Sequence, residues 1–265
     1  MLIQLQVPSV CNLNCNYCYA TKTDSLIQPL DWLNAIANIP GKHEILLGYG
    51  EPSFDPGCMW LTHELLAAGH QVGVITNCTG AVELYANMPD GLTIYPSYHP
   101  YHWELSEFME SLNTYRESGL KIGVVNIVAH PPKLDMLNGW KRILEDDGFE
   151  VCILEFCGFF NGNEYPAAYT VDEKEKVFGY ISERSGVPQD EVDKRLTGGM
   201  KITKCRAGKD YMFVTPGGHA YACTGRPPDG LGDIWSGIHP LTESRPCPYG
   251  TCVCYGNWHL IEESE

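Results

Sequence analysis

Hydrophobic and polar positions over the first 185 residues follow two different periods that alternate along the chain. Short runs rich in Val, Ile and Leu predict strands, and the segments between them have the apolar spacing of amphipathic helices. The predicted strands are residues 2–7, 44–47, 71–75, 92–95, 121–128 and 150–155. The predicted helices are residues 30–36, 59–68, 82–86, 104–117, 133–145 and 171–184. Because this alternation is typical of parallel sheets covered by helices, we expect an α/β fold.

Six strand–helix units indicate either a partial barrel or an open doubly wound sheet, since a closed barrel needs eight. Both architectures place their chemistry at the carboxyl ends of the strands. The residues that follow the predicted strands are rich in cysteine, histidine, asparagine, glycine and glutamate: 11–18, 48–52, 76–80, 97–100, 130–132 and 156–158. The sequence therefore predicts that one rim of the sheet carries the functional residues.

The pattern changes at about residue 196. The following segment is rich in glycine and cysteine, and it contains only two weak strand signals, at 211–214 and 219–222. So few apolar residues would not stabilise a separate unit by themselves, so we expect bound metal to hold it together. We therefore predict two domains, residues 1–195 and residues 196–265.

Composition and charge narrow the possible partners. The chain of 265 residues is 44% hydrophobic, which is enough for a sizeable core, and no apolar run approaches the ~20 residues of a membrane span. Residues 1–7 lack the basic start and long apolar stretch of a secretory signal, so we expect a cytoplasmic protein without membrane contact. A net charge of −15 is the wrong sign for wrapping a phosphate backbone, so we expect no nucleic acid.

Twelve cysteines in such a chain are more consistent with metal ligation or redox chemistry than with disulfides. The first group is Cys11, Cys15 and Cys18, with the spacing C-x3-C-x2-C. An iron–sulfur cubane normally uses four thiolates, so three leave one iron open, as a catalytic centre requires. A zinc knuckle that takes its fourth ligand from elsewhere is the alternative.

This triplet, with the aromatic Tyr17 before its third cysteine, resembles the defining motif of the radical S-adenosylmethionine (radical SAM) superfamily. The resemblance covers residues 1–185 and implies a partial (β/α)6 TIM-like barrel. It also implies that the three cysteines hold a [4Fe-4S] cluster, whose open iron chelates SAM. Gly50-Glu51-Pro52 resembles that family's Gly-Gly-Glu-Pro motif, in which Glu51 would accept a hydrogen bond from the SAM ammonium. Tyr49 replaces the usual first glycine, which is either displaced to Gly48 or lost.

The resemblance assigns further rim residues to SAM. Tyr17 would pack beside the adenine, Ser97 matches the ribose-contacting position, and Asn77 and Asn126 could reach the same cavity. We expect His99 and Glu155 to be the catalytic residues that accept a proton or contact substrate, because both follow strands on this rim. The alternative for His99 is a histidine that caps a turn, and His130, followed by two prolines, has a weaker claim.

The second cysteine group lies near the C-terminus. Cys205, Gly218 and Cys223 have the spacing that opens the SPASM and twitch auxiliary-cluster domains, to which this segment is similar. The remaining Cys247, Cys252 and Cys254 fit the shorter twitch version, which implies one auxiliary [4Fe-4S] cluster. Five cysteines compete for at most four ligand sites, so one is left over. A structural zinc ribbon is the alternative.

The resemblance implies an enzyme that cleaves SAM reductively to a 5′-deoxyadenosyl radical, which abstracts a hydrogen atom from substrate. We expect a polar small-molecule substrate and a net oxidation, with the auxiliary cluster as electron acceptor and a flavodoxin or ferredoxin-type reductant. The alternatives are a small-molecule isomerase or mutase and a peptide-modifying enzyme, for which we would expect a fused peptide-binding segment that residues 1–10 do not supply. A protein without a substrate, an iron–sulfur electron carrier, is the remaining alternative.

Overall fold

The protein is described by a computed structural model that covers residues 1–7, 10–15, 17–18, 27–197, 201–249, 252 and 255–264. Within these residues, ten strands form one sheet in the order β13-β12-β11-β10-β1-β2-β3-β4-β5-β6. The segment from β10 through β1 to β6 is parallel throughout. Its strands are β1 (Leu2–Gln6), β2 (Glu44–Gly48), β3 (Gln71–Thr76), β4 (Leu92–Tyr98), β5 (Val125–Ala129), β6 (Val151–Glu155) and β10 (Tyr211–Val214).

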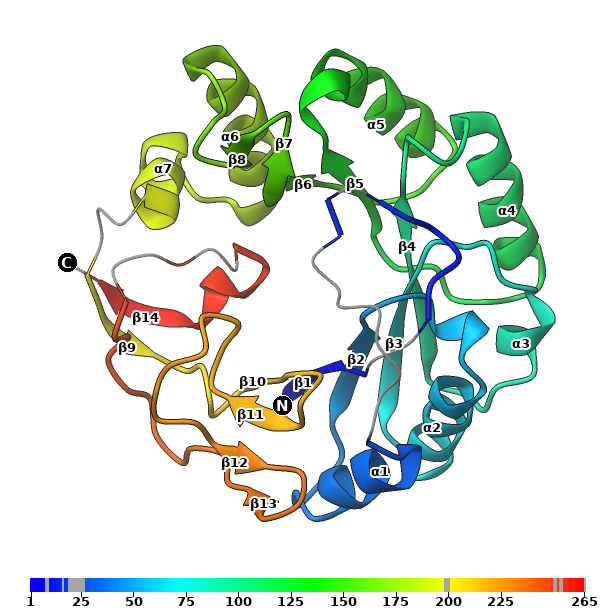
Figure 1. The fold of residues 1–265 in the computed structure, drawn as a ribbon, viewed down its shortest axis with the longest axis vertical. Coiled ribbons are helices and arrows are strands. Elements are labelled where there is room, and N and C mark those ends of the chain that lie inside the picture. Colours follow the sequence, from blue (N-terminus) through cyan, green and yellow to red (C-terminus); the bar gives the residue numbers. More distant parts are fainter. Residues whose placement is uncertain are drawn as a thin grey trace.

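Helices connect these strands and cover one face of the sheet. They are α1 (Pro29–Ala37), α2 (Pro56–Ala67), α3 (Glu83–Ala86), α4 (Leu105–Glu117), α5 (Leu137–Asp146), α6 (Val171–Ser185) and α7 (Gln189–Thr197), with 3-10 turns η1 (Pro52–Phe54), η2 (Pro131–Met136) and η3 (Tyr255–Leu260). Figure 1 shows α1 to α6 as an arc outside the curved sheet. The predicted partial barrel with six strand–helix units is therefore confirmed.

Side chains alternate along each strand between the helix-covered face and the concave face. Buried Ile3, Leu5, Ile45, Leu47 and Val74 lie on the covered face and join the main core. The neighbouring positions, which point the other way, are mostly half-buried because they line the barrel interior. This alternation fixes which rim residues face the interior.

The lower part of the barrel interior is filled by one aromatic side chain. A Cβ on Gly73 or on Gly123 would lie 2.6 Å from the ring of Tyr95, so the ring needs glycine on both sides. The Tyr95 ring therefore fills the space between these two glycines inside the barrel.

The C-terminal strands continue the barrel sheet. β10 pairs with β1 in parallel, Leu2 opposite Tyr211, and β11 (His219–Tyr221), β12 (Gly232–Asp233) and β13 (Gly237–Ile238) extend the sheet in antiparallel fashion. β9 (Ile202–Cys205) pairs separately with β14 (Ile261–Ser264), and a hairpin of β7 (Gly158–Phe160) and β8 (Asn163–Tyr165) follows β6. The segment predicted to be an appended domain thus shares a sheet with the barrel through β10.

Candidate functional site

The cysteine loop begins directly after β1, at the carboxyl end of the parallel sheet. Figure 1 shows this blue segment running inside the arc of helices. Cys11 and Cys15 are half-buried and Cys18 is exposed. The Leu13 amide donates to Cys11 Sγ at 3.4 Å, and the Cys18 amide donates to the Cys15 carbonyl at 3.1 Å. The loop is therefore folded as a tight turn that brings its cysteines to the rim.

Asparagine side chains fasten this loop to the end of β3. Asn77 Nδ2 donates to Asn12 Oδ1 at 3.0 Å and lies 3.9 Å from Cys11 Sγ. Asn12 Nδ2 in turn donates to Thr79 Oγ1 at 2.9 Å. The structure thus brings Asn77 to the cysteine loop, where it supports the loop and contacts the first thiol.

His99 and Tyr17 form a second contact at the same loop. The Tyr17 hydroxyl is hydrogen-bonded to His99 Nδ1 at 2.8 Å, and Cys15 Sγ lies 3.7 Å from the same nitrogen. Burial lowers the pKa of His99 to about 4, so its ring is neutral. Burial, with Cys15 as a further contribution, raises the pKa of Tyr17. His99 therefore lies beside the cysteines rather than simply capping a turn.

Glu51 is completely buried behind the loop and is held by donors of the chain itself. Its Oε1 accepts from Ser53 Oγ at 2.6 Å and Thr76 Oγ1 at 2.7 Å, and its Oε2 accepts from the Asn77 amide at 2.6 Å. Burial raises the pKa of this carboxyl, and the hydrogen bonds oppose that rise. Its own amide donates to the Val10 carbonyl at 2.9 Å. Glu51 thus joins the ends of β2 and β3 to the cysteine loop.

The backbone before Glu51 has the conformation that glycine favours at two successive positions. Gly50 has φ 94°, and Tyr49 has φ 114°, which is a strained value for a bulky residue. Gly48 is the last residue of β2 and lies on the concave face. Position 49 therefore has the backbone conformation of a glycine, although its residue is a tyrosine. Pro52 is buried at the start of η1.

Polar side chains line the concave face next to this turn. Ser97 on β4 and Asn126 on β5 are register partners, so they leave their strands side by side, and both are half-buried. Gln6 at the end of β1 is the partner of Gly48 and is buried. Its Oε1 has no hydrogen-bond partner among the described residues. Gln6 was not predicted as a site residue, although glutamine at alternate positions of an apolar strand is the signal that could have indicated it.

His130 lies at the end of β5 in a box of aromatic rings. Its ring centroid is 4.5–5.4 Å from those of Tyr101, Phe160, Phe156 and Tyr17, and the side chain is completely buried. Within the described part of the chain neither ring nitrogen has a hydrogen-bond partner. Burial lowers the pKa of His130 to about 4, so the ring is neutral. Because His130 packs against Tyr17, which is part of the cysteine loop, it lies next to that loop.

Glu155 leaves β6 on the other face. It is the register partner of Ala129, which is buried under the helices, whereas Leu154 is the partner of the interior-facing Val128. Cys157 Sγ lies 3.8 Å from Glu155 Oε1, and burial together with this carboxylate raises the pKa of Cys157 to about 12. The structure therefore brings His99, but not the Glu155 carboxylate, to the concave side of the rim.

Four cysteines of the second group line a cavity of about 200 Å³. Cys205, Cys223, Cys247 and Cys252 all line it, and Cys254 lies outside the described residues. Among the described residues, no group of three or more histidine, cysteine, aspartate or glutamate side chains could hold a single metal ion. Four cysteines among mostly apolar residues are the lining that a larger, thiolate-bound group would require.

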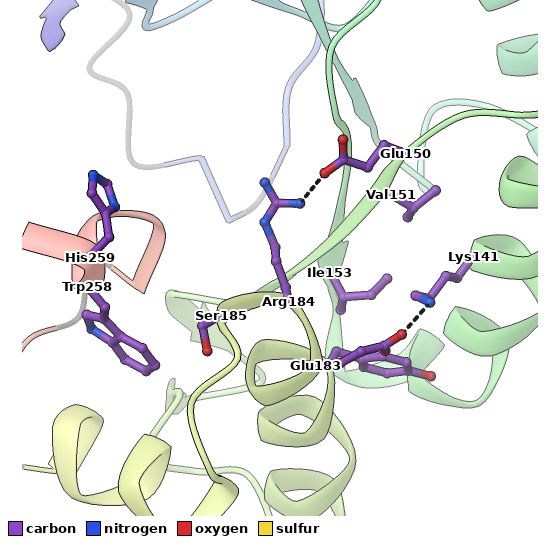
Figure 2. Close-up of a pocket in the computed structure, with 10 residues that line it drawn as sticks. Lys141, Glu150, Val151, Ile153, Glu183, Arg184, Ser185, Trp258 and His259 are labelled. Atoms are coloured by element: carbon purple, nitrogen blue, oxygen red, sulfur yellow. Dashed lines mark hydrogen bonds and ion pairs between the residues drawn. The ribbon is translucent and has the colours of Figure 1, made fainter.

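A larger cavity, of about 450 Å³, lies at the opposite end of β6, where Val151 begins the strand. In Figure 2 its charged side chains face one another in pairs, Arg184 with Glu150 and Lys141 with Glu183, each at 3.2 Å. Chemistry in parallel α/β folds belongs to the carboxyl ends of the strands. This cavity is therefore separate from the cysteine loop and has its cations already paired.

Comparison with known proteins finds solved structures with a similar fold. No family model and no curated protein matches the chain. Among solved structures, native anSMEcpe with bound AdoMet is 13% identical with a TM-score of 0.57, covering 88% of this chain and 78% of that one. Streptococcus suis SuiB bound to S-adenosylmethionine is 14% identical with a TM-score of 0.55, covering 88% of this chain and 61% of SuiB. SuiB bound to precursor peptide SuiA is 15% identical, with a TM-score of 0.56 over 84% of this chain. The chain thus has the fold of structures that bind S-adenosylmethionine.

Within the described residues, no helix is both long and apolar enough to cross a membrane.

Proposed function

We propose that this protein is a radical SAM enzyme with an auxiliary iron–sulfur cluster. The observation that carries the proposal is the position of the Cys11-x3-Cys15-x2-Cys18 loop. It lies at the carboxyl end of β1, tied to Asn77 and in contact with His99, above a concave face with polar side chains. The likeness of the fold to structures with bound S-adenosylmethionine supports it.

The residues fit the groups that this function requires. Cys11, Cys15 and Cys18 would hold a [4Fe-4S] cluster, and Gly50, Ser97 and Asn126 would surround SAM on the concave face. When bound, this pair supplies the abstraction of a hydrogen atom from substrate. Asn77 and Glu51 keep the loop and the Gly50 turn in fixed positions, because both are held by several hydrogen bonds of the chain itself. The aromatic rings around His130 exclude water from one side of the site.

We further propose that Cys205, Cys223, Cys247 and Cys252 hold the auxiliary cluster, because these four line one cavity. An electron acceptor near the substrate favours a net oxidation. His99, which lies at the cysteine loop, would take the accompanying proton at a ring nitrogen. Two kinds of substrate remain. A polar small molecule is the first, and a peptide is the second, which the structures of SuiB with precursor peptide SuiA and of anSMEcpe with Cp18Cys peptide favour.

Metal content and SAM cleavage test the proposal. Protein prepared without oxygen should contain about eight iron atoms per chain, four for each cluster, and should cleave SAM when reduced. Replacing Cys11, Cys15 and Cys18 together by Ala should halve the iron and abolish cleavage. Bound iron without SAM cleavage would indicate an electron carrier, and zinc as the main metal would contradict the auxiliary cluster.

Product mass then tests the reaction type once a substrate is found. A product lighter than the substrate by two hydrogen atoms supports a net oxidation. An isomer of unchanged mass would show that the auxiliary cluster does not accept the substrate electron.

A further inference from the structure

Arg245 is a charged residue in the wall of the C-terminal cysteine cavity. It lines this cavity together with Cys205, Cys223, Cys247 and Cys252. Its backbone is bound to that of Cys205 in both directions: the Cys205 amide donates to the Arg245 carbonyl at 2.9 Å, and the Arg245 amide donates to the Cys205 carbonyl at 3.0 Å. The position of the arginine relative to this cysteine is therefore fixed by the backbone.

The guanidinium group of Arg245 is only partly satisfied. Nη1 donates to the carboxylate of Asp229, whose side chain is mostly exposed. Nη2 is buried and has no hydrogen-bond partner among the described residues. A buried guanidinium N–H without an acceptor is costly, and such groups are rare in folded proteins. No described protein atom therefore accepts a hydrogen bond from this N–H.

Sulfur supplies such an acceptor. The thiolates and sulfides of an iron–sulfur cluster are negatively charged and accept hydrogen bonds, and these bonds set the reduction potential. Reduction adds one electron to the cluster and increases the negative charge on its sulfur atoms. A fixed cation beside them therefore stabilises the reduced state more than the oxidised state.

We propose that Arg245 tunes the auxiliary cluster, with Nη2 donating a hydrogen bond to one of its sulfur atoms and raising its reduction potential. The proposal rests on the proposed function, because it needs a cluster in the cavity of Cys205, Cys223, Cys247 and Cys252. A higher potential makes this cluster the better acceptor of a substrate electron. Asp229 neutralises part of the arginine charge from the solvent side, so it limits the effect.

The experiment measures the midpoint potential of the auxiliary cluster alone. The full-length chain with Cys11, Cys15 and Cys18 replaced by Ala is reconstituted anaerobically with iron and sulfide and titrated while its electron paramagnetic resonance spectrum is recorded. Arg245→Gln should lower the midpoint potential by about 59 mV, a tenfold change for a one-electron couple. Asp229→Asn should shift it in the opposite direction, and Arg245→Lys should give a smaller decrease than Arg245→Gln.

Arg142→Gln is the control, because Arg142 pairs with Asp146 on the exposed side of α5 and is not among the residues that line the cavity. It should leave the potential unchanged. Equal potentials in Arg245→Gln, Asp229→Asn and the parent, with about four iron atoms retained in each, would overturn the proposal for Arg245 while the auxiliary cluster stands. A parent protein that binds no iron would instead contradict the proposed function.

Discussion

Tyr49 holds a backbone conformation, φ 114°, that side chains with a Cβ rarely adopt. Such a conformation costs of order 1–3 kcal/mol and persists only where surrounding contacts enforce it. Here the enforcing contacts are those of Glu51, whose carboxylate and amide are both bound by the chain two residues later. The strain is therefore located at the turn that borders the cysteine loop.

Replacing Tyr49 by Gly should raise the free energy of unfolding by about 1 kcal/mol, because the relief of strain exceeds the added entropy of the unfolded chain. Chemical denaturation of both proteins measures the difference. Tyr101→Gly is the control, since Tyr101 is exposed and its backbone is not in the positive-φ region. That variant should be less stable than the parent. A decrease for Tyr49→Gly as well would show that contacts of the tyrosine side chain outweigh its backbone strain.

His130 contains two polar ring atoms that have no hydrogen-bond partner among the described residues. Aromatic rings pack against the imidazole, and contacts of an N–H with a ring are weaker than a hydrogen bond. His130→Phe keeps the ring shape and removes the unpartnered atoms, so it should raise the free energy of unfolding by about 1 kcal/mol or more. His130→Ala should lower it by several times that amount, about 3 kcal/mol, because it leaves a cavity. Thermal unfolding of the two variants separates these effects, and a less stable His130→Phe protein would contradict the interpretation.

At the scale of elements, two histidines join the amino ends of β2 and β3, far from the cysteine loop. The rings of His43 and His70 stack at 5.5 Å, and the His43 amide donates to His70 Nδ1 at 3.1 Å. His43 Nε2 donates to the Ile39 carbonyl at 3.2 Å. Burial lowers the pKa of both rings, so both are neutral in the folded protein. Protonation of either ring is therefore unfavourable in the folded protein.

This arrangement predicts a loss of stability in acid. Above the unfolded pKa of about 6.5 both states are neutral, and the full stability is present. Below it the unfolded chain binds more protons than the folded one, so stability falls with pH until the lowered folded pKa is reached, by up to about 1.4 kcal/mol per pH unit for each histidine. Denaturation at pH 8, 6.5 and 5.5 should show a smaller decrease for the double variant His43→Gln with His70→Asn. The exposed His63→Gln serves as control, and equal pH dependence in all three proteins would exclude this pair as the cause.

The elements that were predictable from sequence are those with a local signal. Alternation of apolar strands with amphipathic helices predicted β1 to β6 and α1 to α6 within a few residues. The strand segment 211–214 was also predicted, but not its parallel pairing with β1, because pairing of residues 2 and 211 leaves no local trace. Helix α7 and the β7–β8 hairpin were missed, because α7 is short and largely polar and each strand of the hairpin has only three residues.

The same distinction holds for the site. The spacing of Cys11, Cys15 and Cys18 is a local motif and was predicted with its position at the rim. The hydrogen bonds of Asn12 with Asn77 and Thr79, and the aromatic rings around His130, join residues that follow different strands and appear only in the folded chain. The face on which Glu155 lies depends on the register of β6 with β5, which the sequence does not specify.

At the scale of the whole molecule, the C-terminal segment is held in two different ways. β10 belongs to the barrel, because it pairs with β1 and because Met212 and Val214 are part of the main core. The flanking cysteine-bearing loops, in contrast, surround the 200 Å³ cavity, which a bound cluster would fill. Metal binding supplies much of the folding free energy of such loops. The two parts should therefore respond differently when the cluster is lost.

Amide hydrogen exchange of the variant Cys205→Ser with Cys223→Ser, prepared anaerobically beside the parent, tests this difference. The amides of residues 201–209 and 223–229 should exchange faster in the variant, because the ligands that order these loops are gone. The amides of β10 should keep their protection, because β1 and the core still hold that strand. Cys152→Ala, a buried barrel cysteine outside the cavity, should leave exchange in residues 201–229 unchanged. If β10 loses protection together with the loops, residues 196–265 fold as a separate unit that depends on the cluster, as the division at residue 195 predicts.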